Sequence, residues 1–406
     1  MSEGLVSTEA RGGGATGPRA RARKLWLDLH LAIGLVVGSV FVVIGLTGAI
    51  LSFRVEIDEW LNADLLTLSA PAEANAPLVS LDEIIANARA AAPEGATPVF
   101  LHFAKPPRRP ADVIVSIHDS ASGEDRIDQI VMNPYDGSLI GRRTIVDPRS
   151  RFAEPFTVFV IHLHYTLLQG EVGATIVGFA GLLLFVSLAT GLYLWWPRNG
   201  RWRQAFTVKR GASGERLVLD LHKTTAIYVL PALVVIIFSG VYLIFGDQMR
   251  ALVGVVSPVD AHMLREDLKS EPANGRAPIG AAAAAAIVDR LFPDGRLMDM
   301  GLPGPEGAYV VGKRADDEVN TSEPRRRVAV DQYSGAVLQI QDPRDFTAGE
   351  AFLNWQYPLH TGEAFGDPGR VFICMMGFVP ALLYATGVIR WLQKRRTRRR
   401  KLDATA

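Results

Sequence analysis

The sequence contains almost no cysteine and lacks the common nucleotide and protease motifs. Its single cysteine is Cys374, so neither a disulfide framework nor a thiolate metal site can be built. No glycine-rich phosphate loop leads from a strand into a helix, and there is no dinucleotide fingerprint and no HExxH zinc motif. We therefore expect no nicotinamide or flavin site. A formal net charge of +1 over 406 residues indicates no nucleic-acid partner.

Apolar residues are abundant, and they are concentrated in a few places. The chain is 49% hydrophobic and 21% charged, which alone would suit a soluble enzyme. Four segments are nevertheless long and apolar enough to cross a bilayer, which takes roughly 20 such residues. They are 25–53, 172–196, 217–245 and 370–392. The sequence therefore predicts an α-helical integral membrane protein with four transmembrane helices in contact with membrane lipid.

Positive charges predict the orientation of these spans. Arginine and lysine gather in the leader 1–24, in the loop 197–216 and in the tail 393–406, and such residues mark the cytoplasmic side. We expect both termini in the cytoplasm, and the longer segments 54–171 and 246–369 outside. The leader, with GGGATGPRARAR, is expected to be disordered. The first span is too long for a signal-peptide core and reads as an uncleaved anchor.

The chain repeats itself. An offset of 192 aligns the first span with the third, and an offset of 196 aligns the second with the fourth. The aligned landmarks are Asp28 with Asp220, His30 with His222, Thr47-Gly48 with Ser239-Gly240, His164 with His360, and Thr190-Gly191 with Thr386-Gly387. Both halves begin on the same side, so we predict two parallel tandem repeats, about 1–205 and 206–406, related by an axis along the membrane normal.

Each outer segment is predicted to fold as a small α+β domain. In the first, a helical pattern at 81–92 precedes alternating strand patterns at 99–104, 112–118 and 126–132. An Asp-Gly turn then leads into a hairpin partner. The second repeats the order, with a helix in IGAAAAAAIVDRLF and strands near 307–314, 326–332 and 336–341.

Histidines within the spans are the main functional signal, because ionisable side chains in a membrane are costly. His30 and His222 lie at equal depth, on the order of 9 Å inside the cytoplasmic interface. Two imidazoles that face each other across the repeat axis can supply both axial ligands of one haem. His164 and His360, at the outer ends of spans two and four, can hold a second. His30 and His164 cannot share one iron, since most of a bilayer, roughly 30 Å, separates them.

Other interpretations of these polar residues remain open. A histidine in a span can simply bond a neighbouring helix. His162 is near His164 but aligns with Pro358, so it is either an alternative ligand or an ordinary interfacial residue. Asp28 and Asp220 suit a first helical turn, or they orient the histidine of the opposite repeat.

Further residues suit a haem. Lys223 at the inner level and Arg370 at the outer level are candidate partners for haem propionates. The first span has a face of small residues, which serves either close helix packing or a flat macrocycle; it consists of Gly34, Gly38, Gly45 and Gly48.

Two stretches carry a family resemblance. LHLAIGLVVGSVFVVIGLTGAILSF from Leu29 and LHTGEAFGDPGRVFICMMGFVPALLYATGVIRW from Leu359 resemble the PepSY-associated transmembrane family, which includes iron-regulated inner-membrane proteins and ferric-siderophore reductases of Gram-negative bacteria. The resemblance covers about residues 24–396. Its LH motifs fall on His30 and His222, and its LHTG histidine on His360. LHYT stands at 163–166 where LHTG is expected, so His164 keeps the ligand type without the glycine.

The resemblance implies two PepSY-like outer domains and two b-type haems in a bacterial inner-membrane protein. Electrons from a cytoplasmic or quinol donor would enter at the His30/His222 haem and pass to the His164/His360 haem. They would there reduce a periplasmic ferric siderophore held between the outer domains and release ferrous iron. The resemblance also implies association with iron-uptake proteins.

Two other functions are alternatives to this one. In the first, the PepSY-like domains bind peptides or restrain a protease, the spans are anchors, and no haem is bound. In the second the protein is a transporter, but four spans are few for that, and Pro231 of the third span aligns with Ser39, so no pair of broken helices appears at matching positions.

Overall fold

The computed structural model describes residues 18–68, 77–103, 109–120, 122–198, 200–265 and 267–404. Its residues form two compact units. The helical unit consists of the described residues of Met1–Val42, Ala180–Val234 and Pro380–Ala406, and the sheet unit of those of Val43–Phe179 and Val235–Val379.

The four predicted spans are present as long apolar helices. They belong to α1 (Pro18–Leu51), α6 (Gly170–Trp195), α8 (Gly214–Ile244) and the consecutive α13 (Gly366–Gly377) and α14 (Val379–Asp403). Pro231 lies inside α8 without ending it. The fourth span is interrupted at Phe378, two residues before Pro380, because proline has no N–H group to donate and its ring clashes with the carbonyl four residues earlier.

Both charged ends of the chain are more helical than expected. α1 begins at Pro18, so residues 18–24 are helical and not disordered, and the rest of the predicted leader lies outside the described residues. Proline suits a first helical position, and the arginine, alanine, lysine and leucine that follow are good helix formers. At the other end, α14 continues through the basic tail to Asp403.

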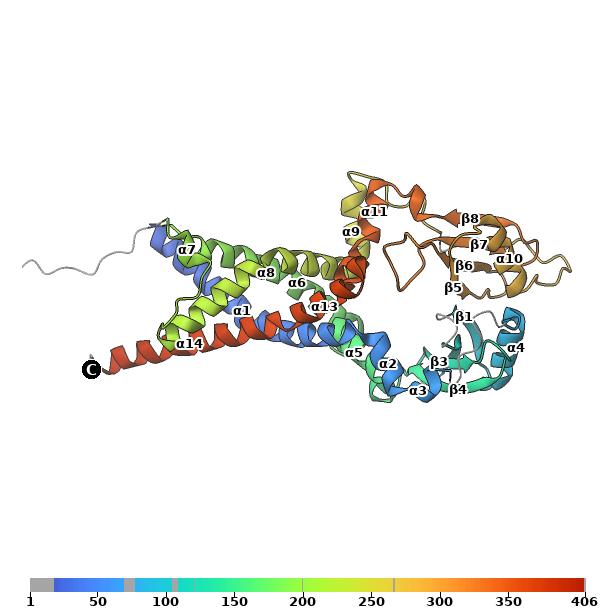
Figure 1. The fold of residues 1–406 in the computed structure, drawn as a ribbon, viewed down its shortest axis with the longest axis horizontal. Coiled ribbons are helices and arrows are strands. Elements are labelled where there is room, and N and C mark those ends of the chain that lie inside the picture. The colour runs from blue at the N-terminus through green and yellow to red at the C-terminus, as the bar shows by residue number, and fades with distance from the viewer. Residues whose placement is uncertain are drawn as a thin grey trace, which may run out of the picture. The chain divides into compact units, whose positions relative to one another are not determined.

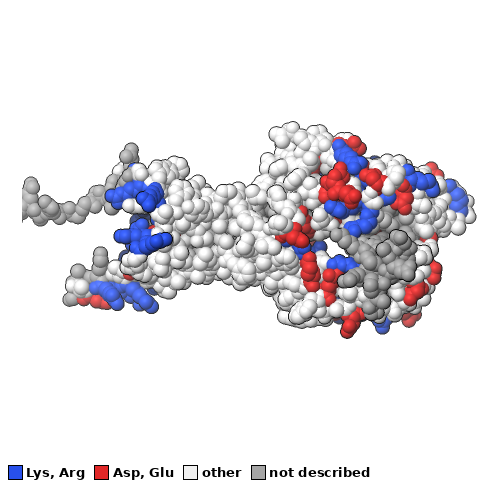
Figure 2. Space-filling view, viewed as in Figure 1, with Lys and Arg blue, Asp and Glu red and all other residues white. Residues whose placement is uncertain are grey.

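The helical unit is held by apolar contacts and by a cluster of aromatic rings. Ile33 and Val37 of α1 pack against Ala180 of α6. The indole of Trp195 donates to the carbonyl of Ala205, at the end of the short α7 (Trp202–Ala205), with an N–O distance of 3.1 Å. Figure 2 shows the helices largely white, with lysine and arginine gathered where α7 and the end of α14 lie.

The sheet unit contains one continuous antiparallel sheet of eight strands in the order β4-β3-β2-β1-β5-β6-β7-β8. The strands are β1 (Thr97–Phe103), β2 (Ala111–Asp119), β3 (Glu124–Met132), β4 (Leu139–Val146), β5 (Arg296–Gly301), β6 (Ala308–Arg314), β7 (Arg327–Asp331) and β8 (Val337–Gln341). The predicted turn and hairpin are present as β3 and β4.

The sheet differs from the expected pair of separate domains at its centre. β1 and β5 pair in the register Phe100↔Gly301, Leu101↔Met300 and His102↔Asp299. β5 was not predicted, because its sequence RLMDMG places an aspartate among residues that are buried. Without this pairing, β1 and β5 would both be exposed edges, which proteins generally cover or pair.

Two helices cover one face of the sheet (Figure 1). They are α4 (Leu81–Ala91) and α10 (Ala281–Leu291). Ile84 of α4 and Val288 of α10 are fully buried in a single apolar core with the sheet. Asp82 of α4 accepts hydrogen bonds at the start of α10, from the backbone N–H of Ala281 at 2.6 Å and of Ala282 at 3.3 Å, so the two halves of the chain are also joined by a helix cap.

The opposite face of the sheet carries charged side chains. Asp112, between the core residues Ala111 and Val113, points to this face. His102 of β1 is in cross-strand register with both Asp112 and Asp299. Burial raises the pKa of each of these two carboxyl groups to about 6, and burial together with nearby arginines lowers the pKa of His102 to about 4.

Shorter helices complete the sheet unit. They are α2 (Arg54–Leu61), α3 (Ala63–Leu66), α5 (Phe156–Thr166), α9 (Gly246–Gly254), α11 (Ala348–Asn354) and α12 (Gln356–Thr361). Two of them matter most for the site, because α5 carries His164 and α12 carries His360.

Candidate functional site: two pairs of facing histidines

Each of the four predicted histidines lies against a hydroxyl–glycine dipeptide of another helix. The combinations are His30 with Thr190-Gly191, His222 with Thr386-Gly387, His164 with Thr47-Gly48, and His360 with Ser239-Gly240. The first two lie in the helical unit and the last two in the sheet unit. We call each dipeptide an imidazole cradle.

In the helical unit, the cradles hold the Nδ1 atoms. His30 Nδ1 lies 3.1 Å from the Thr190 hydroxyl and 3.1 Å from the carbonyl of Ser187. His222 Nδ1 lies 2.9 Å from the Thr386 hydroxyl. Both hydroxyls already donate to backbone carbonyls of their own helices. Each hydroxyl oxygen therefore accepts from Nδ1–H, and Nε2 keeps its lone pair.

The sheet unit repeats this arrangement. His164 Nδ1 lies 3.0 Å from the hydroxyl of Thr47, and His360 Nδ1 lies 3.0 Å from that of Ser239 and 3.1 Å from the carbonyl of Ile236. Thr47 donates to the carbonyl of Val43, and Ser239 to a carbonyl of its own helix. The same tautomer follows, with Nε2 free to bind a metal.

The glycines allow the rings to approach. A Cβ added at Gly191, Gly48 or Gly240 would lie 3.0–3.1 Å from Cε1 of the cradled histidine. At Gly387 the corresponding distance is 3.7 Å, an ordinary contact. At three of the four cradles a side chain in place of glycine would crowd the imidazole, while at the fourth there is room for a Cβ.

The four rings form two pairs. His30 and His222 have ring centroids 6.4 Å apart at an interplanar angle of 87°, and His164 and His360 are 6.2 Å apart at 63°. Two metal–imidazole bonds of about 2 Å each, with about 1 Å from each ring centre to its nitrogen, span about 6 Å. One metal ion therefore fits between the rings of each pair.

The residues around each pair indicate which kind of metal centre could bind between the two imidazoles. Within the described part of the chain, no group of three or more His, Cys, Asp or Glu side chains could hold a metal ion. Two imidazoles alone leave a metal under-coordinated, whereas a haem brings four nitrogen ligands and needs only two axial ones. Gly34, one turn after His30, has no heavy atom within 4 Å of where a Cβ would be, which leaves room for a flat group. The residues present fit haem.

The turn after His164 shows how the chain manages without the glycine of LHTG. In the second half, Gly362 ends α12 with φ 84°. In the first half, α5 runs on to Thr166, and Leu167 and Leu168 adopt φ values of 50° and 60°. Such values are strained for residues other than glycine. The turn is shifted, and the imidazole of His164 still reaches its cradle.

The two predicted propionate partners are both engaged elsewhere. Lys223 forms an ion pair with the buried Asp220 at 2.9 Å and donates to the carbonyl of Gln204. Arg370 pairs with Glu56 at 2.6 Å and with Asp367 at 3.1 Å. Both side chains are already engaged in ion pairs, so neither is a free cation for a propionate.

The remaining candidates also have other roles. His162 donates through Nδ1 to the buried Glu154 at 2.7 Å and belongs to neither facing pair. Asp28 is exposed and pairs with Lys24. Asp220 binds Arg216 and Lys223. None of the hydrogen bonds described for His30 and His222 comes from either aspartate, so the orienting role is taken by the cradles.

The cradles themselves were the functional residues that sequence reasoning missed. Their signal was present, because a threonine or serine followed by glycine occurs at four positions that the internal repeat brings into correspondence. The dipeptides served only as landmarks for the alignment, since nothing in a linear sequence shows which helix lies against which histidine.

Four long apolar helices, an attached antiparallel sheet and two partly buried histidine pairs define a multi-pass membrane protein with two equivalent candidate metal sites. Residues 27–394 match the model of the PepSY-associated TM region, and the chain belongs to this family. No curated protein matches the sequence.

Proposed function

We propose that the protein is a di-haem electron-transfer protein of the bacterial inner membrane. It reduces ferric siderophores in the periplasm, so that ferrous iron is released for uptake. The observation that supports this most directly is the presence of two facing imidazole pairs, with centroids 6.4 and 6.2 Å apart, whose Nδ1 atoms are all bonded to cradle hydroxyls.

The chain's own residues fix the ligands in advance. Each cradle sets one imidazole tautomer, orients its ring and leaves Nε2 directed away from the hydroxyl. His30 and His222 would hold one haem, and His164 and His360 the other. The haems would supply one-electron redox chemistry.

The proposed reaction transfers one electron to each ferric ion. Each ferric ion gains one electron and becomes ferrous, which siderophores bind more weakly. A quinol that is oxidised to quinone loses two electrons and two protons, and so serves two ferric chelates; a cytoplasmic one-electron donor serves one. The basic segments near the spans support a cytoplasmic position for both termini, and in this proposal the substrate is reduced on the periplasmic side.

The test is an absorption spectrum of the detergent-purified protein, oxidised and dithionite-reduced, with pyridine haemochrome quantitation. We expect a reducible b-type spectrum and about two haems per chain. The reduced protein, mixed with a ferric siderophore and a ferrous-specific dye, should reoxidise and release ferrous iron. A colourless protein after expression with ample haem would contradict the proposal and favour a peptide-binding role. If the protein binds haem but releases no ferrous iron, the proposed electron transfer would stand and the proposed ferric-siderophore substrate would be wrong.

A further inference from the structure

A cleft of about 540 Å³ lies in the second half of the sheet unit, within the range of about 300–1,000 Å³ typical of small-molecule sites. It occupies the sheet face opposite α10, because Tyr309 and Val311 of β6 belong to the core on the α10 side and Val310 between them faces the cleft. Its apolar wall consists of Leu264, Leu268, Leu302, Pro303 and Val310.

One wall of this cleft is a loop that β8 holds in place. The side-chain oxygen of Gln341 accepts from the backbone N–H of Leu264 at 2.8 Å, and that of Gln339 accepts from Arg265 at 3.0 Å. Gln339 also donates to the carbonyl of Met263. The loop is thus attached to the sheet through the backbone of Met263, Leu264 and Arg265.

The cleft is lined by several arginines, one of which is poorly compensated. Three of the described lining residues are arginines and none is acidic: Arg265, Arg325 and Arg327. Arg327 is paired with Asp299 at 3.1 Å, and Arg265 with the exposed Asp267. Arg325 has the weakest compensation, since its nearest carboxylate oxygen, on Glu323, is 4.0 Å away. Its Nε is buried and has no hydrogen-bond partner among the described residues.

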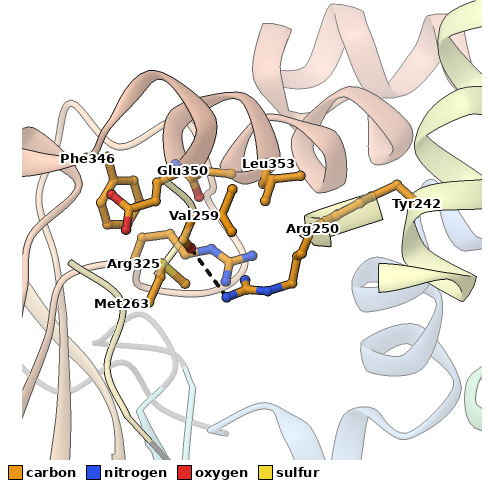
Figure 3. Close-up of a pocket in the computed structure, with 9 residues that line it drawn as sticks. Tyr242, Arg250, Val259, Met263, Arg325, Phe346, Glu350 and Leu353 are labelled. Atoms are coloured by element: carbon orange, nitrogen blue, oxygen red, sulfur yellow. Dashed lines mark hydrogen bonds between the residues drawn. The ribbon is translucent and has the colours of Figure 1, made fainter. Parts of the chain in front are cut away.

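Arg325 also connects this cleft with the second histidine pair. Together with Met263 it lines a smaller cavity of about 40 Å³, which Tyr242 of α8 and Asn354 of α11 also line. Figure 3 shows the side chains of Arg325 and Arg250 reaching into this cavity from different segments. Arg250 is neutralised by Asp260, whereas Asn354 Oδ1 is buried without a described partner.

The helices that line the small cavity are those that hold His360. Tyr242 follows the cradle glycine Gly240 by two residues on α8. Asn354 ends α11, and α12, which begins two residues later, carries His360. A ligand in the large cleft is therefore separated from the helices of the second pair by one shared wall, at Arg325 and Met263.

We propose that this cleft is the substrate site and that it selects anionic metal chelates, with Arg325 as the main residue that recognises the negative charge and Arg265, whose pair with Asp267 is exposed to solvent, as a weaker one. This inference rests on the proposed reductase function for the identity of the substrate. Guanidinium groups form strong charge-assisted hydrogen bonds with anionic oxygens, while the leucine and valine wall covers the organic arms of the chelate. A cationic chelate would instead meet the weakly compensated guanidinium of Arg325.

The binding test uses the full-length protein in detergent and gallium(III) complexes, which resemble their iron(III) counterparts but are not reduced. Titration calorimetry compares a trianionic gallium tris-catecholate with the cationic gallium desferrioxamine complex. We expect the anionic complex to bind at least about ten-fold more tightly, and Arg325→Gln to weaken it about ten- to a hundred-fold, the equivalent of one charged hydrogen bond. Arg265→Gln should weaken it to a smaller extent.

Two further variants control this experiment. Arg276→Gln removes an exposed arginine of the same unit that pairs with Glu271 and does not line the cleft, so its affinity should equal that of the wild type. Arg325→Lys keeps the charge and should recover most of the affinity lost in Arg325→Gln. Equal affinities for the two complexes, no binding of either, or unchanged binding in both glutamine variants would overturn the proposal.

The inference and the function on which it rests fail in different ways. If the anionic gallium complex binds as expected but the reduced protein does not reduce its ferric counterpart, the anion site stands and the reductase function fails. If ferric complexes of both charges are reduced and the gallium complexes bind equally well, the reductase function stands and the charge selection fails.

Discussion

The imidazole Nδ1 of His360 lies 3.0 Å from the hydroxyl of Ser239, while the Cα of the next residue, Gly240, faces Cε1 of the same ring. Two adjacent residues thus set the tautomer of one histidine and make room for it. Because serine donates its own proton to Val235, it can only accept from the imidazole. In all four cradles the hydroxyl accepts from the imidazole and the glycine lies beside the ring. The position of each predicted ligand therefore depends on two neighbours that can be substituted separately.

Removing one histidine of a pair should remove one haem. We expect His222→Ala and His360→Ala each to lose about one of two haems by pyridine haemochrome, because a single axial imidazole leaves the iron five-coordinate and weakly held. His118→Ala, which alters an exposed side chain paired with Asp125, is the control and should keep both. Retention of two haems in either ligand variant would disprove the assignment for that pair.

The cradle glycines offer a matched steric test. A methyl group at Gly240 would lie 3.0 Å from His360 Cε1, whereas at Gly387 it would lie 3.7 Å from His222 Cε1. Gly240→Ala should therefore displace its imidazole and lower haem retention at the second pair, while Gly387→Ala should leave the spectrum and midpoint potential close to those of the wild type. Equal losses in the two variants would show that Cβ contact with the ring is not the cause.

A different substitution tests the cradle hydroxyl without changing the cradle glycine. Thr386→Val removes the acceptor 2.9 Å from His222 Nδ1, so we expect weaker haem retention at the first pair and a shifted midpoint potential, because the hydrogen bond tunes the ligand's basicity. Thr386→Ser keeps the oxygen and should restore both properties. If Thr386→Val and Thr386→Ser had the same midpoint potential in a potentiometric titration, the hydroxyl would have no role in tuning the ligand.

Much of the fold could be predicted because its signals are local. Four apolar segments of sufficient length gave the spans, and alternation gave seven of the eight strands near their observed positions. β5 could not be found in this way, because its partner β1 lies about 200 residues earlier and its burial depends on that pairing. The strands of the two halves form one sheet because β1 and β5 pair, and this contact is not local in the sequence.

The pairing of the histidines could be predicted from the sequence, and their surroundings could not. The internal repeat singles out His30, His222, His164 and His360, and the structure brings them together in pairs. Lys223 was a reasonable propionate partner by depth, but its neighbour Asp220 neutralises it one turn away. Such a competing ion pair depends on side-chain directions that spacing alone does not decide.

The cap that Asp82 places on α10 should contribute measurably to stability. Asp82→Ala removes the acceptor for the N–H groups of Ala281 and Ala282, and loss of an N-terminal cap typically costs about 1 kcal/mol, within a range of 0.5–2. Glu83→Ala, at the next position of the same first turn, has no such contact and should cost less. Thermal unfolding in detergent compares the two variants, and equal shifts would mean that the cap between the halves is not stabilising.

The charged face of the sheet predicts a dependence of stability on pH. Burial raises the pKa of Asp112 from 3.8 to about 6, so the folded protein binds this proton more tightly than the unfolded chain does. Stability from this group is full below about pH 4 and is lost as the pH rises through 6. At pH 8, Asp112→Asn should therefore be more stable than the wild type, on the order of 2 kcal/mol before allowance for partial exposure.

The advantage of Asp112→Asn should shrink as the pH falls and disappear near pH 4, where the wild-type carboxyl group is protonated as well. Asp136→Asn provides a control of opposite sign, because hydrogen bonds from Ser138 lower the pKa of Asp136, and its loss should destabilise the protein slightly at neutral pH. Unfolding temperatures measured from pH 4 to pH 8 in one detergent separate the two cases. An Asp112→Asn curve parallel to that of the wild type would show that this carboxyl group is not the source of the pH dependence.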